Sequence, residues 1–103
     1  MIARIWHGWT KPADAATYEE LLRTKILPGI ARQNIPGYRG AELFIHENTH
    51  EMEFVTLLRF DSMDAVVLFA GPDAARPVIH SDAEPLLTRM DTHSRHYRVV
   101  RLD

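Results

Sequence analysis

The chain contains no cysteine, and this absence excludes disulfide bonds, thiol nucleophiles and cysteine-ligated metal sites. It has no apolar run near the roughly 20 residues that a membrane-spanning helix needs, so we expect no membrane partner. The formal net charge of −2 gives no general attraction to nucleic acid or anionic lipid. Because no charged and apolar leader follows Met1, the default expectation is a soluble, cytoplasmic protein.

Motifs of the common catalytic and nucleotide-binding folds are absent as well. The sequence has no phosphate loop, no dinucleotide-binding glycine pattern and no GxSxG nucleophile motif. The spacing of its histidines and carboxylates supports no metal site. We therefore expect no cofactor. With 103 residues, of which 46% are apolar and 25% charged, the chain is expected to form a single domain over residues 1–103.

The stretch from Pro36 to Phe60 is the centre of the predicted fold. Two apolar runs of strand length, Tyr38–Ile45 and Met52–Phe60, flank the polar, turn-forming segment His46–Glu51. Such a pattern indicates a β-hairpin. Both runs have apolar residues at odd and even positions, so we expect both faces of the sheet to be covered.

A strand and a helix are predicted before the hairpin. Met1–Trp9 is rich in strand-forming residues, and a helix is expected over roughly Ala13–Leu27. Pro28 should end that helix, because proline has no N–H to donate to the preceding turn. One further turn is expected at Ile30–Gln33.

After the hairpin, a second helix is predicted from Met63 to Ala70. Asp61-Ser62 provides its N-cap, and Gly71-Pro72 ends it. A short helix running from Asp82 through Met90 and a last strand over His93–Leu102 complete the pattern.

The resulting order, βαββαβ, indicates an α+β fold of the ferredoxin-like type. Right-handed crossovers give a four-stranded antiparallel sheet with the strands in the order 4-1-3-2. Helices cover one face of such a sheet, whereas Trp6, Phe44 and Leu57 suggest apolar side chains on both faces. A second copy of the same sheet is the simplest partner for the uncovered face, so we expect a homodimer.

Four segments resemble one known family: the opening MIARIWHGWTKP, PGYRGAEL, EFVTLLRFDSMDAVVLFAG and the tail HSRHY. Together they look like the antibiotic biosynthesis monooxygenase (ABM) family of dimeric α/β barrels, across essentially the whole chain. The resemblance implies a homodimer whose two sheets close a barrel, with a cavity in each subunit between sheet and helices. Some members oxidise aromatic polyketides or quinols with O₂ and no cofactor, relatives cleave haem, and many have no known activity.

The haem-cleaving relatives use an asparagine on the first strand, a tryptophan on the second helix and a histidine after it. By the resemblance, these positions fall near Ile5, on Phe69, and at Ile79 or His80. Two of the three residue types are missing, so the resemblance does not support haem cleavage by that mechanism. Haem binding by His80 stays open.

The histidines are the natural candidates for proton transfer. His80 is the first candidate for a catalytic base, because it follows the second helix in an irregular segment where pocket rims lie. The alternative is a solvent-exposed loop histidine. His7 is the second candidate, since it faces either the cavity or a buried hydrogen-bond partner. His96, on the strand beside the first one, could approach His7.

Aromatic and apolar residues of the predicted cavity could hold a flat aromatic substrate, although in a small sheet such residues more often form plain core. The residues expected to bind the substrate are Ile5, Trp9, Tyr18, Phe69 and His96.

Arginines within strands need an explanation, because a guanidinium on a covered face must be paired or must reach a polar cavity. Arg4, Arg59 and Arg98 are in this position. One reading is an ion pair with Glu42 or Glu53 across a subunit boundary, and the other is anchoring a phenolate.

Two functions remain open at this point. The first is a cofactor-independent monooxygenase that oxidises an aromatic quinol or anthrone with O₂, using one histidine as base. The second is a non-catalytic dimeric barrel that binds a small ligand or haem, or serves as a scaffold. A polar group inside a ligand-sized apolar cavity favours the first, and a cavity filled by side chains favours the second.

Overall fold

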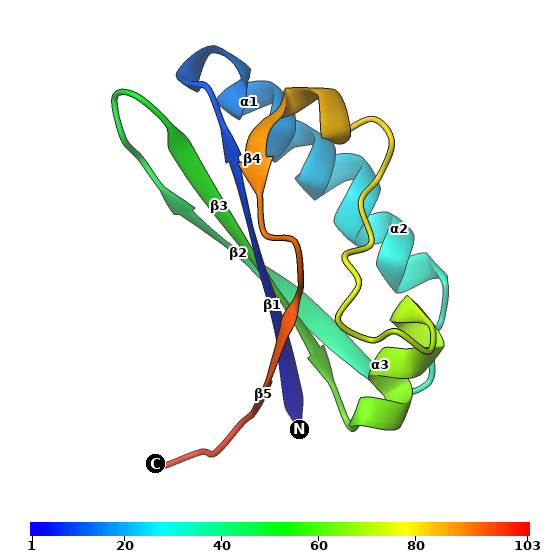
Figure 1. Cartoon of the computed structure of the whole chain (residues 1–103). Coiled ribbons are helices and arrows are strands. Elements are labelled where there is room, and N and C mark those ends of the chain that lie inside the picture. Colours follow the sequence, from blue (N-terminus) through cyan, green and yellow to red (C-terminus); the bar gives the residue numbers. More distant parts are fainter.

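An antiparallel sheet forms the centre of the fold in the computed structural model, which describes all residues from 1 to 103. Strands β2 (Tyr38–His46) and β3 (Met52–Phe60) form the predicted hairpin, and β1 (Ile2–Thr10) pairs antiparallel with β3. The sheet order is β2-β3-β1-β4, with β5 also on β1, as Figure 1 shows. The predicted α+β architecture and the strand order 4-1-3-2 are thereby confirmed.

The fourth strand position is divided between two short strands. β4 (Leu87–Met90) pairs with β1 over Gly8–Thr10, and β5 (Arg95–Arg98) pairs with β1 over Ile2–Ile5. The prediction of a helix through Met90 was therefore wrong.

Only a 3₁₀ turn, η2 (Glu84–Leu86), remains of that predicted helix. The free edge of β1 offers ladder hydrogen bonds that a helix over Leu87–Met90 could not use. The last strand is also shorter than predicted, because residues 99–103 continue past β5 without regular structure.

The first helical segment is longer and less regular than expected. α1 (Pro12–Leu21), a π-helical turn η1 (Leu22–Ile26) and α2 (Leu27–Arg32) follow one another without a gap, so Pro28 does not end the helix. The Leu27 N–H bonds to the carbonyl of Leu22, five residues back. This wider turn directly before Pro28 gives its ring the room that a regular α-helical turn would not.

The second helix matches its prediction. α3 spans Met63–Ala70, the Ser62 hydroxyl accepts the Ala65 N–H at 3.2 Å, and Gly71 follows with φ at 90°. None of the helices combines the length and the hydrophobicity that a membrane span requires.

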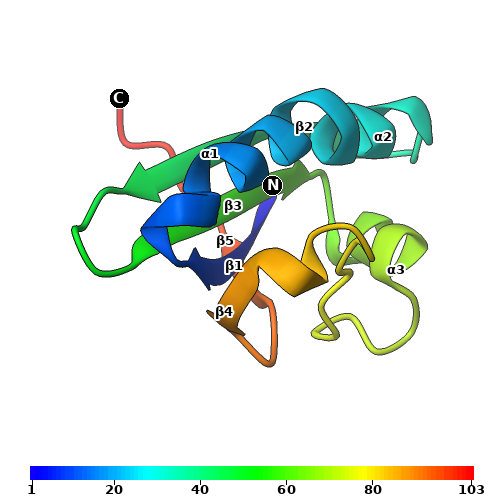
Figure 2. The same cartoon turned by 90° about the horizontal axis from the view of Figure 1, so that it is seen from above.

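The helices pack on one face of the sheet, over two core clusters (Figures 1 and 2). Tyr18 and Leu22 of the first helical segment contact Phe54 of β3, and Ala65 and Val66 of α3 pack on Leu58 and Phe60, also of β3. Since Phe54, Leu58 and Phe60 are spaced by even numbers of residues, they share one face of the strand. The gap between the two clusters is where the pocket lies.

The other side of the sheet has no helix on it, and we call it the open face. Its side chains alternate with those of the helix-covered face along every strand. Phe44 and Tyr97 on this face are 47% and 46% exposed. Arg59 and Glu42, also there, form an ion pair within the chain. The members of the open face include Ile5, His7, Trp9, Phe44, Val55, Leu57 and Tyr97.

Candidate functional site

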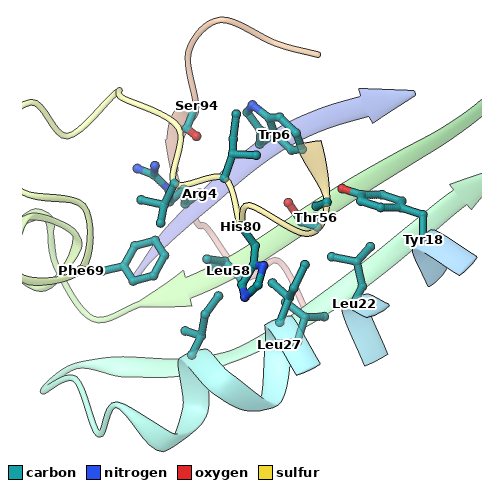
Figure 3. Close-up of a pocket in the computed structure, with 15 residues that line it drawn as sticks. Arg4, Trp6, Tyr18, Leu22, Leu27, Thr56, Leu58, Phe69, His80 and Ser94 are labelled. Carbon is teal, nitrogen blue, oxygen red and sulfur yellow. The ribbon is translucent and has the colours of Figure 1, made fainter. Parts of the chain in front are cut away.

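A narrow, mostly apolar pocket lies between the sheet and the helices (Figure 3). Of its 15 lining residues 11 are hydrophobic, and the cavity volume is about 60 Å³. In the form seen here the pocket is a slot among side chains, smaller than a typical ligand site.

Strands, helices and one irregular segment build the pocket walls. β1 and β3 form the floor with Trp6 and Leu58, and the π-helical turn and α2 form one side with Leu22 and Leu27. The segment between α3 and η2 closes the opposite side. The polar side chains in the lining are Arg4, Thr56, His80 and Ser94, together with the phenol of Tyr18.

The π-helical turn contributes directly to this wall. Leu22 and Ile26, its first and last residues, both line the pocket. π-Helical turns within α-helices are frequent at functional sites, because they redirect side chains that a regular helix would place elsewhere. Pro28, which predicted the end of a helix, was the local signal for this irregularity.

His80 lies in the pocket lining, as its position in the sequence predicted. Its Nδ1 accepts the backbone N–H of Asp82 at 3.1 Å, so the neutral ring carries its proton on Nε2. Lys25 of the π-helical turn pairs with the Asp82 carboxylate and lowers the pKa of that group. The histidine is thus held on a segment that an ion pair ties to the first helical segment.

Arg4 is the charged group of the pocket and is 3% exposed. Its guanidinium donates to the carbonyls of Ala74 and Arg76 and bonds to His96 Nε2 at 2.9 Å. Burial lowers the pKa of Arg4 from its usual value. Its carbon Cζ lies 5.5 Å from the centre of the Phe69 ring, within cation–π range.

Tyr18 and Phe69 line the pocket as predicted. Tyr18 is 2% exposed and packs edge-on against Phe54, with ring centres 4.8 Å apart. Burial raises the pKa of the Tyr18 phenol to about 12. This phenol is therefore neutral near pH 7 and can serve as a hydrogen-bond donor but not as a base.

Ile5, His7 and Trp9 do not line the pocket, because they lie on the open face of β1. Trp9 stacks on His7 with ring centres 6.0 Å apart, and the Arg89 guanidinium lies 3.9 Å from the Trp9 ring centre. His7 is bonded to Asp91, a residue that the sequence did not mark. The structure brings Arg4 and Trp6 to the pocket in their place.

His96 does not approach His7, as the sequence had suggested, because it pairs across β1 with Arg4 on the helix-covered face. It accepts a hydrogen bond there from the Arg4 guanidinium, so its neutral ring has the proton on Nδ1. Burial lowers the pKa of His96, and the positive charge of Arg4 lowers it further. His96 thus contacts Arg4 but is not itself among the residues that line the pocket.

Comparison with protein families gave no matching family model, and no curated protein matches the chain. Solved structures do match. A Bacillus cereus protein assigned to the antibiotic biosynthesis monooxygenases superposes with a TM-score of 0.68 at 14% identity, over 99% of this chain and 93% of its own.

Two structures from Mycobacterium tuberculosis are also similar. MhuD, a haem degrader solved with two haems bound in its active site, has a TM-score of 0.59 at 23% identity, over 100% of this chain and 98% of its own. Rv0793 has a TM-score of 0.58 at 19% identity, over 99% and 95% of the two chains. At these identities the likeness establishes the fold. The chain has the ferredoxin-like α+β fold found in solved proteins assigned to the ABM family.

Proposed function

We propose that the pocket is the active site of a cofactor-independent, ABM-type monooxygenase acting on an electron-rich aromatic such as a quinol or anthrone. The observation that carries this proposal is His80, the one histidine among the side chains that line the pocket. The Tyr18 phenol, whose pKa burial raises to about 12, stays protonated near pH 7 and does not serve as the base. A single base in an apolar slot suits deprotonation of a substrate that then reacts with O₂ by itself.

The reaction balances with O₂ as the only co-reactant. For an anthrone, His80 takes one proton from the CH₂ carbon, directly or through the phenol tautomer, and the resulting anion gives its electrons to O₂. A C–O bond forms to one oxygen atom and the O–O bond breaks. The second oxygen leaves as water with both hydrogens of the carbon, so the carbon loses four electrons and O₂ gains four.

His80 must change its hydrogen bonding to act as the base. In the present form its Nδ1 lone pair accepts the Asp82 N–H, and Nε2 carries the proton. In this tautomer the Nε2–H group can donate a hydrogen bond to a substrate anion and so stabilise it. To accept a proton, the ring must release Asp82, for example by rotation about its Cβ–Cγ bond.

Substrate entry requires the pocket to widen, since its space is about 60 Å³. The wall between Gly71 and Ser81 has no helix or strand and is the element best suited to move. Ser94 N–H bonds to the Ala75 carbonyl at 2.8 Å, and Arg4 bonds to the carbonyls on either side. Displacing this wall breaks these hydrogen bonds and the packing of Ala74 on one core cluster, but it leaves the buried members of both clusters in place.

Oxygen uptake in the presence of 1,8-dihydroxyanthrone tests the proposal. We expect protein-dependent O₂ consumption with formation of the anthraquinone, and a decrease on the order of 10²-fold in His80→Ala. His93→Ala is the matched control, because His93 is exposed, does not line the pocket, and has its side-chain hydrogen bond with its neighbour Thr92. If wild type does not accelerate oxidation of any quinol or anthrone tried, a ligand-binding role replaces the enzymatic one.

Haem binding is the second candidate, favoured by the likeness to the haem-bound MhuD structure and by His80 in the pocket. The residues fit haem poorly. A porphyrin is far larger than the slot, and Ile5, the strand position implied by the resemblance, lies on the open face. A haem titration followed in the Soret band, with His80→Ala beside wild type, separates a specific haem site from surface adsorption.

We further propose that the protein is a homodimer joined through the open face. Ile5, Trp9 and Leu57 form an apolar centre there, and Phe44 at 47% exposure extends it. Apolar side chains on an uncovered sheet face mark an interaction surface. A second copy presents the same apolar centre, which makes a self-complementary, two-fold interface possible.

A further inference from the structure

Arg4 is a buried cation without an anionic partner. It is 3% exposed, and its hydrogen bonds go to two neutral carbonyls and to His96, which accepts the bond through its neutral ring. None of the ion pairs in the chain includes Arg4. Isolated buried charges are costly, and proteins normally pair them.

The pocket side of Arg4 supplies no carboxylate either. The 15 lining residues include neither aspartate nor glutamate. A guanidinium has five N–H groups, and the contacts to Ala74, Arg76 and His96 use three of them. Two N–H groups therefore remain for a further acceptor.

Other polar groups and an aromatic ring lie at the same end of the pocket. Figure 3 shows Ser94 and Phe69 beside the Arg4 guanidinium, and Ser94 is 5% exposed. A serine hydroxyl can donate to an anionic oxygen, and the Phe69 ring can contact the body of an aromatic molecule. The cation, the hydroxyl and the ring together match an aromatic molecule with one anionic oxygen.

We propose that Arg4 binds an anionic oxygen of the ligand, so that the pocket selects aromatic molecules ionised as a phenolate, enolate or carboxylate. This inference rests on the proposed function in that both use the same pocket. The ligand oxygen completes the charge pairing of Arg4, and the apolar remainder of the ligand contacts the wall. For an oxidisable substrate, the same contact stabilises the anion that reacts with O₂.

The competing explanation gives Arg4 a structural role only. Its bonds to the carbonyls of Ala74 and Arg76 fasten the wall of the pocket to β1. A purely structural arginine affects binding of charged and neutral ligands equally, because it changes only the shape of the pocket. A recognition arginine affects the charged ligand selectively, so a matched pair of ligands separates the two roles.

4-Nitrophenol and 4-nitroanisole are such a pair, since they differ by one methyl group and only the phenol ionises near neutrality. The experiment titrates the protein with each probe at a fixed pH, without O₂, and follows the yellow phenolate absorbance. We expect wild type to raise the phenolate fraction of bound nitrophenol, with binding at least about tenfold tighter for phenolate than for phenol. Arg4→Lys should keep most of this preference, and Arg4→Gln should lose it while still binding nitroanisole.

Three outcomes would overturn the inference. Wild type binding phenolate no better than phenol rules it out without any variant. An unchanged phenolate preference in Arg4→Gln assigns the charge selection to another group. Equal loss of both probes in Arg4→Gln, with the melting temperature of wild type, leaves Arg4 only the structural role. This test measures binding and not oxidation. It therefore stays valid if the proposed monooxygenase activity is not found, and its failure would not by itself exclude that activity.

Discussion

His7 and Asp91 join the central strand to the link between β4 and β5 through a set of reciprocal hydrogen bonds. His7 Nδ1 lies 2.6 Å from Asp91 Oδ2, and the His7 backbone N–H donates to the same oxygen at 3.0 Å. The Asp91 N–H donates in turn to the His7 carbonyl at 2.9 Å. The Trp6 indole N–H donates to the Asp91 carbonyl, also at 2.9 Å. Asp91 thus fixes where the divided fourth strand leaves β1.

This pair predicts a selective effect on stability. We expect His7→Ala to lower the free energy of unfolding by about 1–2 kcal/mol, because it leaves the Asp91 carboxylate with one donor fewer. His7→Asn is the matched control, since an asparagine amide N–H can take the place of His7 Nδ1–H. Urea denaturation of both variants checks the prediction. Equal losses in the two variants would mean that His7 contributes packing and not the hydrogen bond.

The parts of the fold that follow from local signals were predictable from the sequence. The Ser62 cap and the Gly71 stop define α3, and the polar segment after Ile45 defines the hairpin. Two of the errors depend on distant or cooperative structure. Leu87–Met90 is a strand because the edge of β1 is free to pair with it, and Pro28 is tolerated because a π-helical turn precedes it.

The candidate site was predictable only in part for a related reason. His80, Tyr18 and Phe69 lie where the sequence placed them. Side chains alternate between the two faces of β1, so Arg4 and His7 lie on opposite faces of the sheet. This alternation does not show which of the two faces the helices cover. Both faces of β1 carry apolar residues, so the face that the helices cover is decided by how the helices pack.

The two glycines with φ near 90° should differ in their sensitivity to substitution. Gly37 and Gly71 have φ of 86° and 90°, so alanine is strained at both, by about 1–2 kcal/mol. A Cβ atom on Gly37 would also lie 2.7 Å from Ala65 Cβ, whereas nothing lies within 4 Å of one on Gly71. We therefore expect Gly37→Ala to lower the melting temperature more than Gly71→Ala. Indistinguishable melting curves would contradict the close approach of Gly37 to α3.

His96 should make stability depend on pH in a defined direction. Burial, and then the charge of Arg4, lower the pKa of His96 in the folded protein below 6.5. The unfolded chain then binds a proton more readily, so this contribution to stability is full above about pH 6.5 and is lost as the pH falls through the lowered pKa. His96→Gln keeps an acceptor for Arg4 but does not titrate. Between about pH 7.5 and 5, thermal melts should show wild type losing more stability than His96→Gln, and parallel curves would argue against the shift.

The proposed dimer can be tested by placing a charge on the open face. Leu57→Asp puts a carboxylate in the apolar centre of that face, and we expect it to give a monomer by light scattering at micromolar concentration. Leu68→Asp is the control, because Leu68 is 63% exposed and lies on α3 of the helical layer. An obligate interface of this kind buries about 2,000 Å² or more in total, so wild type should stay dimeric on dilution. A monomeric wild type would exclude the closed barrel.

The protonation of His80 gives the most direct test of its chemical role. In the free protein the Asp82 N–H donates to His80 Nδ1, so we expect the neutral ring to carry its proton on Nε2. Long-range ¹H–¹⁵N NMR distinguishes the two nitrogens, and His80→Ala identifies the signals. Addition of 4-nitrophenolate should keep the Nε2–H form if His80 stabilises an anion as donor. Protonation of both ring nitrogens upon binding of a phenol would instead show that the ring has taken the phenolic proton as base. A free ring with its proton on Nδ1 would contradict the hydrogen bond from Asp82 and the inference that the ring must release Asp82 before it accepts a proton.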